Sequence, residues 1–151
     1  MNKLFSLILI LILITSGTLY AAESERFITK LKLPSGLTAV VAEGEFEARS
    51  IGSFSILLYD AAAPGDETTF FLSGLIHPRD GGIEKVVLAD VVGDRRPEIV
   101  AIVRSVGTGG YLSAHAFAID KQRLLFRAAV ESLPPDADPL AALRKAKRKS
   151  K

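Results

Sequence analysis

The sequence predicts a mainly β protein, a single antiparallel β-sandwich of about eight strands with a short C-terminal helix. Short alternating or β-branched runs recur between residues 27 and 133, and turns that contain glycine or proline separate them. After the last run, Pro134-Pro135 breaks the chain, and Asp138-Pro139 supplies a helix N-cap and a first helical residue. Strands and turns at this spacing, with no internal repeat, are typical of one sandwich or barrel.

The first four strands are expected over residues 27–33, 37–42, 53–59 and 68–76. The first alternates apolar and polar residues, as a half-buried strand does. Pro34-Ser35-Gly36 turns the chain back, so the first two strands should form a hairpin. Gly74 interrupts the fourth strand. Residues 78–82 contain one proline and two glycines and predict a loop. His77 directly precedes Pro78 and is expected in the same loop.

The other four strands are expected over residues 83–92, 98–104, 111–119 and 122–133. The first two are rich in β-branched residues and flank a turn. The third alternates, with Tyr111, Ser113, His115, Phe117 and Ile119 on one face and Leu112, Ala114, Ala116 and Ala118 on the other. The fourth fits a strand or a helix, and its neighbours favour a strand. Residues 140–149 predict the short helix.

The first residues have the layout of a secretory signal peptide. Met1-Asn2-Lys3 is a short positive start, and an apolar run of 11 residues over 4–14, broken only by Ser6, precedes small residues. A run of this length is too short to span a bilayer, which takes about 20 residues. We therefore expect cleavage after Ala21 or Ala22, export to the periplasm, and no stable membrane insertion of the mature chain.

Charge divides the rest of the chain into two parts. Residues 22–139 hold 12 Lys and Arg against 17 Asp and Glu, a net charge of −5, whereas residues 140–151 hold six basic residues and no acid. The predicted domains are a signal peptide (1–21), a β-sandwich domain (22–139) and a basic helix or tail (140–151). The tail is most simply a solvated helix end, with contact to an anionic surface as the alternative.

Composition excludes several function classes. An exported acidic body with only 7% aromatic residues is not typical of proteins that bind nucleic acid. The absence of cysteine excludes thiol catalysis, thiolate metal sites and lipid attachment at a cysteine.

No set of residues has the spacing of a catalytic site. The two histidines, His77 and His115, are 38 residues apart. The serine motif Gly-x-Ser-x-Gly and the zinc motif His-Glu-x-x-His are absent. We therefore predict no catalytic residue, no metal site and no cofactor, so the chain is not expected to be an enzyme. An enzyme would need His115 with a nearby acid.

The acidic turn, residues 90–98, resembles the calcium-binding turns of integrin-like repeat proteins. Val92 takes a ligand position and Arg95 brings a positive charge, whereas calcium takes about six to eight oxygen ligands. A structural turn in which Asp94 accepts hydrogen bonds from backbone amides is therefore favoured. A carbohydrate- or calcium-binding envelope module that uses the turn from Asp90 to Glu98 is the alternative function.

The glycine loop, residues 105–111 with the sequence SVGTGGY, connects two predicted strands. It lacks the third glycine of a dinucleotide-binding fingerprint, and no helix pattern follows it. One interpretation is a flexible hairpin connection. The other is a narrow tongue on which Thr108 and Tyr111 present hydroxyl groups, while the glycines let the backbone approach another surface closely.

With this loop the sequence resembles the bacterial periplasmic inhibitors of invertebrate-type (I-type) lysozyme. Thr108-Gly109-Gly110-Tyr111 matches the Ser-Gly-x-Tyr loop of lysozyme inhibitors, with Thr in place of Ser, so the hydroxyl is kept and a methyl is added. The likeness includes Arg104-Ser105, the turn Gly93-Asp94…Pro97-Glu98 and the ending at residues 133–143. It spans roughly the second half of the mature chain.

The resemblance implies an eight-stranded antiparallel sandwich that inhibits I-type lysozyme by inserting the loop into its active-site cleft, which would protect bacterial peptidoglycan. The residues implied in the inhibitory loop are Thr108, Gly109, Gly110 and Tyr111, with Ser105 and Gly107 supporting them. It also implies a homodimer. The expected partner is I-type lysozyme, and nucleic acid is not expected as a partner.

Overall fold

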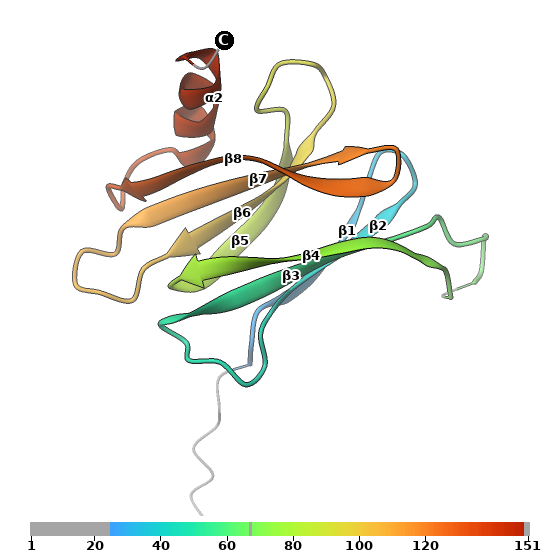
Figure 1. Ribbon diagram of the computed structural model, residues 1–151, viewed down its shortest axis with the longest axis horizontal. Coiled ribbons are helices and arrows are strands. Elements are labelled where there is room, and N and C mark those ends of the chain that lie inside the picture. The colour runs from blue at the N-terminus through green and yellow to red at the C-terminus, as the bar shows by residue number, and fades with distance from the viewer. Residues whose placement is uncertain (1–24, 67, 150–151) are drawn as a thin grey trace, which may run out of the picture.

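The computed structural model describes residues 25–66 and 68–149, and the predicted signal peptide lies outside them. The strands are β1 (Ile28–Lys32), β2 (Thr38–Glu43), β3 (Ile51–Tyr59), β4 (Phe71–Asp80), β5 (Gly82–Ala89), β6 (Glu98–Arg104), β7 (Leu112–Asp120) and β8 (Arg123–Leu133), followed by the helix α2 (Pro139–Lys149). They form two four-stranded antiparallel sheets, one of β1 to β4 and one of β5 to β8, each in chain order (Figure 1). This confirms the predicted fold class.

The two sheets bury their inner faces against each other. From β3, Phe54, Ile56 and Leu58 are fully buried, and they pack in one cluster with Ile99 of β6 and Phe117 of β7. The rings of Phe54 and Phe117 meet edge to face, with centroids 5.9 Å apart, a geometry that aromatic pairs favour. Apolar residues at alternate positions of these strands therefore form the core of the sandwich.

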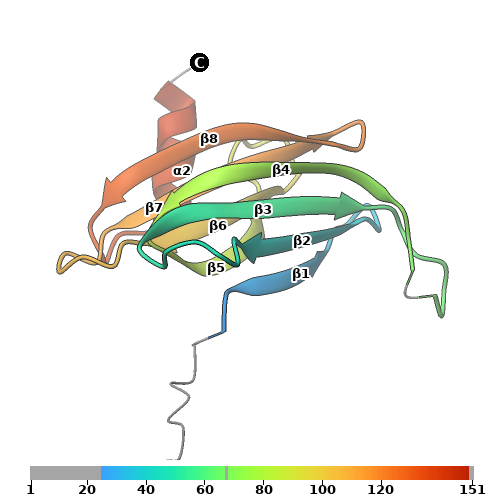
Figure 2. The same ribbon diagram turned by 60° about the horizontal axis from the view of Figure 1, so that its bottom comes forward.

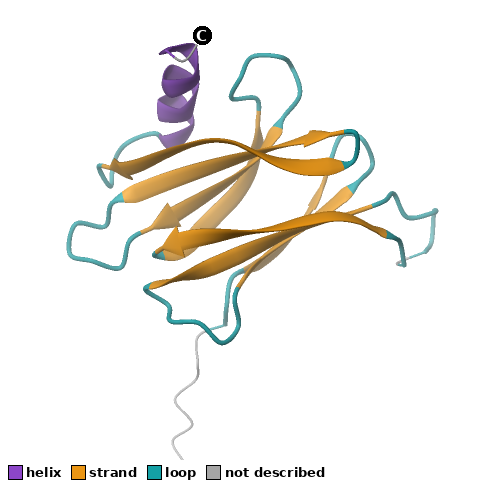
Figure 3. Cartoon of the chain, viewed as in Figure 1, coloured by secondary structure: helices purple, strands orange, loops and turns teal. Residues whose placement is uncertain are grey.

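The helix covers the outer face of the sheet formed by β5 to β8 (Figure 3). Leu143 is fully buried there and packs with Val100 and Ile102 of β6 and with Ala114 and Ala116 of β7. Both faces of β7 are therefore buried. Of the two alternating sets of residues predicted for this strand, one faces the core between the sheets and the other faces the apolar cluster under the helix. Within the described residues, no helix is long and apolar enough to cross a membrane.

The predicted loop over residues 78–82 is wrong. Strand β4 continues through Pro78 to Asp80, and β5 begins at Gly82. Pro78 is tolerated because β4 is an edge strand, where a missing backbone N–H costs no ladder bond. The chain turns at Gly81, where φ is +125° and a Cβ would lie 2.1 Å from the carbonyl oxygen of Arg104. His77 therefore lies in a strand.

Other element ends agree more closely with the sequence. Strand β6 has the predicted bounds, and residues 123–133 form a strand, as their neighbours indicated. Asp138 caps α2: its Oδ1 accepts the backbone N–H groups of Leu140 at 2.9 Å and Ala141 at 3.2 Å. Strand β5 ends at Ala89, before the expected Val92, because Asp90 begins the acidic turn.

Antiparallel strands place alternate connections at the same end of the sandwich. One end carries the β2–β3 loop (residues 44–50), the β4–β5 junction at Gly81, the glycine loop between β6 and β7, and the segment 134–138 that leads to α2 (Figures 1 and 2). We call this end the loop end. The predicted inhibitory residues all lie here.

Candidate functional site

The glycine loop is a short turn closed by its own backbone. The N–H of Ser105 donates to the carbonyl of Tyr111 at 2.9 Å, and the N–H of Gly110 donates to the carbonyl of Gly107 at 3.1 Å. The second bond closes a four-residue β-turn in which Thr108 is one of the two central residues. Thr108 therefore lies at the tip of the loop, where it is exposed.

Arg104, the last residue of β6, attaches the loop to the sheet. Its Nη1 donates to the carbonyl of Gly110 at 2.9 Å, and its Nε donates to the carboxylate of Glu84 on β5. This hydrogen bond is the largest cause of a lowered pKa at Glu84 and of a raised pKa at Arg104. The side chain that holds the loop is thus itself held by a neighbouring strand.

The ring of Tyr111 lies over the backbone of Gly109. A Cβ placed at Gly109 would be 2.3 Å from Cε2 of Tyr111, whereas carbon atoms in contact are about 3.5–4.0 Å apart. Only glycine at this position allows the ring to lie where it does. Tyr111 is still 53% exposed, so the ring and the backbone form one narrow projection.

The remaining predicted loop residues differ in what they contribute. Ser105 is half-buried and closes the base of the loop through its backbone. Gly110 has φ of +52°, in the left-handed region that glycine adopts at little cost. Gly107 has no positive φ, and a Cβ added there would meet nothing within 4 Å. The turn therefore favours glycine at 110, the position of the Tyr111 ring requires glycine at 109, and neither requires it at 107.

The pair of Arg104 and Glu84 that supports the loop was not predicted from the sequence. The two residues are 20 positions apart, and nothing in their spacing links them. They meet because β5 and β6 are paired, with Gly82 opposite Arg104. Only the pairing of β5 with β6 in the folded chain brings these two side chains together.

The two histidines, far apart in the sequence, are in contact. Nε2 of His77 on β4 and Nδ1 of His115 on β7 are 3.0 Å apart, a hydrogen-bond distance between the two sheets. His115 is 6% exposed, and burial, followed by the charge of His77, lowers its pKa to about 4. The ring of Phe54 lies beside both histidines, and the ring of Phe117 lies beside His77. The pair is thus a neutral part of the core near pH 7.

The acidic turn uses its carboxylates to hold its own backbone. Asp90 accepts two backbone N–H groups of the turn, at 2.6 and 2.8 Å. Asp94 accepts the backbone N–H of Arg96 at 2.9 Å and pairs with its guanidinium, as predicted for a structural turn. Glu98, 2% exposed, accepts the N–H of Val91. The described residues contain no group of three or more His, Cys, Asp or Glu side chains that could hold a metal ion.

Comparisons with known proteins show which family the chain resembles. Residues 25–147 match the family model described as periplasmic lysozyme inhibitor of I-type lysozyme. No sequence match was found among curated proteins.

Solved structures give the same result. The chain is similar to the crystal structure of the periplasmic lysozyme inhibitor of I-type lysozyme from Aeromonas hydrophila, with 42% identity and a TM-score of 0.72 over 78% of this chain and 98% of that one. It is also similar to the Aeromonas hydrophila inhibitor in complex with Meretrix lusoria lysozyme, with 41% identity and a TM-score of 0.72 over 78% of this chain and 95% of that one. These matches confirm the family that the loop indicated: the chain belongs to the periplasmic lysozyme inhibitors of I-type lysozyme.

Proposed function

We propose that this chain inhibits an I-type lysozyme by inserting the glycine loop into the enzyme's active-site cleft, and that it thereby protects bacterial peptidoglycan in the periplasm. The observation that carries the proposal is the loop itself: a hydroxyl at its tip, an aromatic ring against its backbone, and a base attached to the sheet by Arg104. The complex of a related inhibitor with Meretrix lusoria lysozyme supports the choice of partner.

The chemistry of a lysozyme cleft suits these groups. Lysozymes cleave a glycosidic bond with two carboxyl groups, one protonated and one ionised. The hydroxyl of Thr108 can donate to an ionised carboxylate or accept from a protonated one. Gly109 and Gly110 carry no side chains that would widen the loop. Tyr111 supplies a large flat surface with few rotatable bonds, as interface anchors do.

The attachment of the loop also favours binding. Ordering a mobile side chain at an interface costs about 0.5–1.5 kcal/mol. In this chain the Tyr111 ring already lies on Gly109, and the carbonyl of Gly110 is already bonded to Arg104. The loop therefore meets the enzyme close to one fixed conformation, and less of the binding energy is lost.

The test is inhibition of cell-wall lysis by the purified mature protein, measured with I-type, chicken-type and goose-type lysozymes. We expect inhibition of an I-type enzyme, and we expect Tyr111→Ala to weaken it roughly thirtyfold or more, since truncating an anchor costs ~2 kcal/mol or more. Thr108→Ala should cost less, about 1 kcal/mol for one hydrogen bond. Undiminished inhibition by Tyr111→Ala would refute insertion of the loop.

The calcium- or carbohydrate-binding alternative has no support from the acidic turn. The oxygens of Asp90 and Asp94 already accept hydrogen bonds from the turn and from Arg96. The homodimer implied by the family remains a prediction, which sedimentation of the mature protein would test.

A further inference from the structure

A second loop at the loop end presents a phenylalanine that none of the described residues covers. Phe46 lies at the turn of the β2–β3 loop, residues 44–50, and is 100% exposed. Single exposed apolar residues are common on protein surfaces, so its exposure alone indicates little. What distinguishes Phe46 is how the backbone beneath it is held and what lies beside it.

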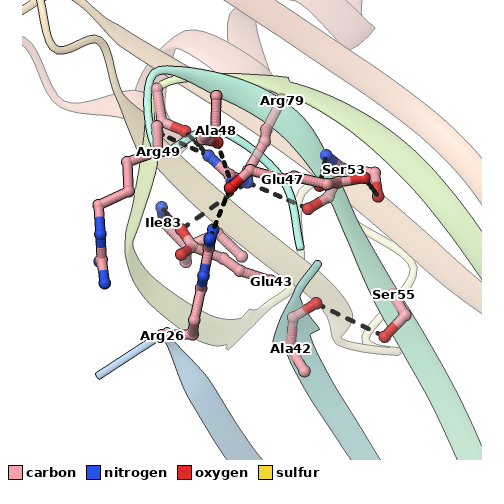
Figure 4. A network of polar contacts seen from close by, with 11 residues as sticks. Arg26, Ala42, Glu43, Glu47, Ala48, Arg49, Ser53, Ser55, Arg79 and Ile83 are labelled. Carbon is pink, nitrogen blue, oxygen red and sulfur yellow. Dashed lines mark hydrogen bonds and ion pairs between the residues drawn. The ribbon is translucent and has the colours of Figure 1, made fainter. Parts of the chain in front are cut away.

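Hydrogen bonds from a buried arginine hold the backbone of this loop. The side chain of Arg79 on β4 is fully buried, and its Nη atoms donate to the carbonyls of Arg49 at 2.8 Å and Ala48 at 3.1 Å. Its Nε donates to the carbonyl of Ser53 at 3.0 Å (Figure 4). Its Nη1 also donates to the carbonyl of Gly81 at 2.5 Å. A buried guanidinium bonded to four carbonyls ties the loop to the β3 and β4 strands and to the β4–β5 junction.

The other side of the loop is held as well. The carboxylate of Glu47 folds back on Ser53, accepting its backbone N–H at 2.5 Å and its hydroxyl at 2.7 Å. These bonds are the largest causes of the lowered pKa of Glu47. Arg26 donates to the carbonyl of Glu47 at 2.5 Å. A Cβ at Gly44 or Gly52 would lie 2.4 Å from this carboxylate, so both glycines make room for it.

The two loops are connected through direct contacts. Arg79 bonds both the β2–β3 loop and the carbonyl of Gly81, and Gly81 packs so closely on the end of β6 that its Cβ would lie 2.8 Å from Cα of Ser105. Ser105 begins the glycine loop. The views of the fold place both loops at the loop end (Figures 1 and 2). Their relative position is thus set by the hydrogen bonds of Arg79 and by the close packing of Gly81 on the end of β6.

The loop end also gathers exposed apolar side chains. Besides Phe46, they are Ile51 at 64%, Val106 at 64% and Tyr111 at 53% exposure. Two of these belong to the glycine loop, and Ile51 begins β3 next to the β2–β3 loop. Interfaces bind most strongly through a few aromatic anchors that partners bury fully.

We propose that Phe46 is a second anchor for I-type lysozyme, which binds apolar surface of the enzyme outside the cleft that the glycine loop enters. This rests on the proposed function, because it takes the same lysozyme as the partner. The rigid backbone under Phe46 allows the ring to be buried without first ordering the loop. The β2–β3 loop thereby contributes affinity and selects among lysozymes with different surfaces beside the cleft.

The experiment measures the dissociation constant and dissociation rate of an I-type lysozyme with the parent protein, Phe46→Ala, Phe46→Tyr and Phe70→Ala. Phe70 is the matched control: it is 81% exposed but precedes β4, at the opposite end of the sandwich. We expect Phe46→Ala to raise the dissociation constant about tenfold or more, mainly through faster dissociation. Phe46→Tyr keeps the ring and should bind like the parent, as should Phe70→Ala.

Tyr111→Ala, measured beside these variants, separates the two hypotheses. If Tyr111→Ala binds weakly while Phe46→Ala binds within twofold of the parent, the second anchor is refuted and the proposed function stands. If the parent inhibits no I-type lysozyme, the proposed function fails and the second anchor fails with it. An altered sedimentation coefficient of Phe46→Ala, with lysozyme affinity unchanged, would refute the proposal and assign the ring to contact between two copies of this chain.

Discussion

Gly109→Ala tests whether the conformation of the Tyr111 ring matters for inhibition. Neither Gly109 nor Gly107 has a positive φ, so alanine strains the backbone at neither position. At Gly109, however, the new Cβ would lie 2.3 Å from Cε2 and 2.8 Å from Cδ2 of Tyr111. Contact distances are about 3.5–4.0 Å, so the ring must move by more than 1 Å, roughly the difference between 2.3 Å and that range.

A displaced anchor should cost much of what a truncated one costs. We expect Gly109→Ala to weaken inhibition of an I-type lysozyme by up to about thirtyfold, the effect of losing ~2 kcal/mol. The melting temperature should stay within a few degrees, because Tyr111 is half-exposed and the clash lies outside the core. Gly107→Ala is the matched control, since a Cβ there meets nothing within 4 Å. Its inhibition should stay close to that of the parent.

A double-mutant cycle makes the test sharper. If Gly109→Ala acts by displacing the ring, it should cost little when Tyr111 is already alanine, so the two effects should be strongly non-additive. Inhibition constants and melting curves are measured for both single variants, the double variant and the parent. Full additivity, or equal losses from alanine at positions 107 and 109, would refute the reasoning.

Three further predictions concern stability. His115 is neutral in the folded protein, with its pKa lowered from 6.5 to about 4, so unfolding takes up a proton below pH 6.5. The contribution of His115 to the free energy of unfolding should be constant above that pH and should fall by up to roughly 3 kcal/mol towards pH 4. Denaturant curves at several pH values should show this fall, and His115→Gln should lack it. Calcium and chelators should leave the melting temperature unchanged, and a rise with calcium would contradict the structural assignment of the acidic turn. Removing residues 144–151 should preserve cooperative unfolding, whereas Leu143→Ala, which empties a fully buried site, should cost about 2–5 kcal/mol in urea titrations.

Local sequence signals were sufficient for the strands and the helix cap. Period-2 alternation predicted β7 because successive side chains of a strand point to opposite faces. Asp138-Pro139 predicted the start of α2 because a carboxylate satisfies the free amides of a first helical turn. The glycine loop was identifiable from its composition and from its resemblance to a known family.

The same local signals failed where tertiary position decides. Pro78 and two nearby glycines predicted a loop, but an edge strand tolerates proline because it has no neighbour on one side. The alternation of β7 could not show that its second face is covered by α2, since a sequence pattern does not identify what packs against it.

The sequence by itself determined the number and order of the strands, the helix and the place of the glycine loop, because each depends on residues close together in the chain. The tertiary structure alone decided which distant residues meet: Arg104 with Glu84 at the base of the loop, His77 with His115 across the sheets, and Arg79 with the β2–β3 loop. These contacts depend on strand register and sheet packing. Shifting a strand by one residue turns every side chain to the other face, so no local pattern specifies them.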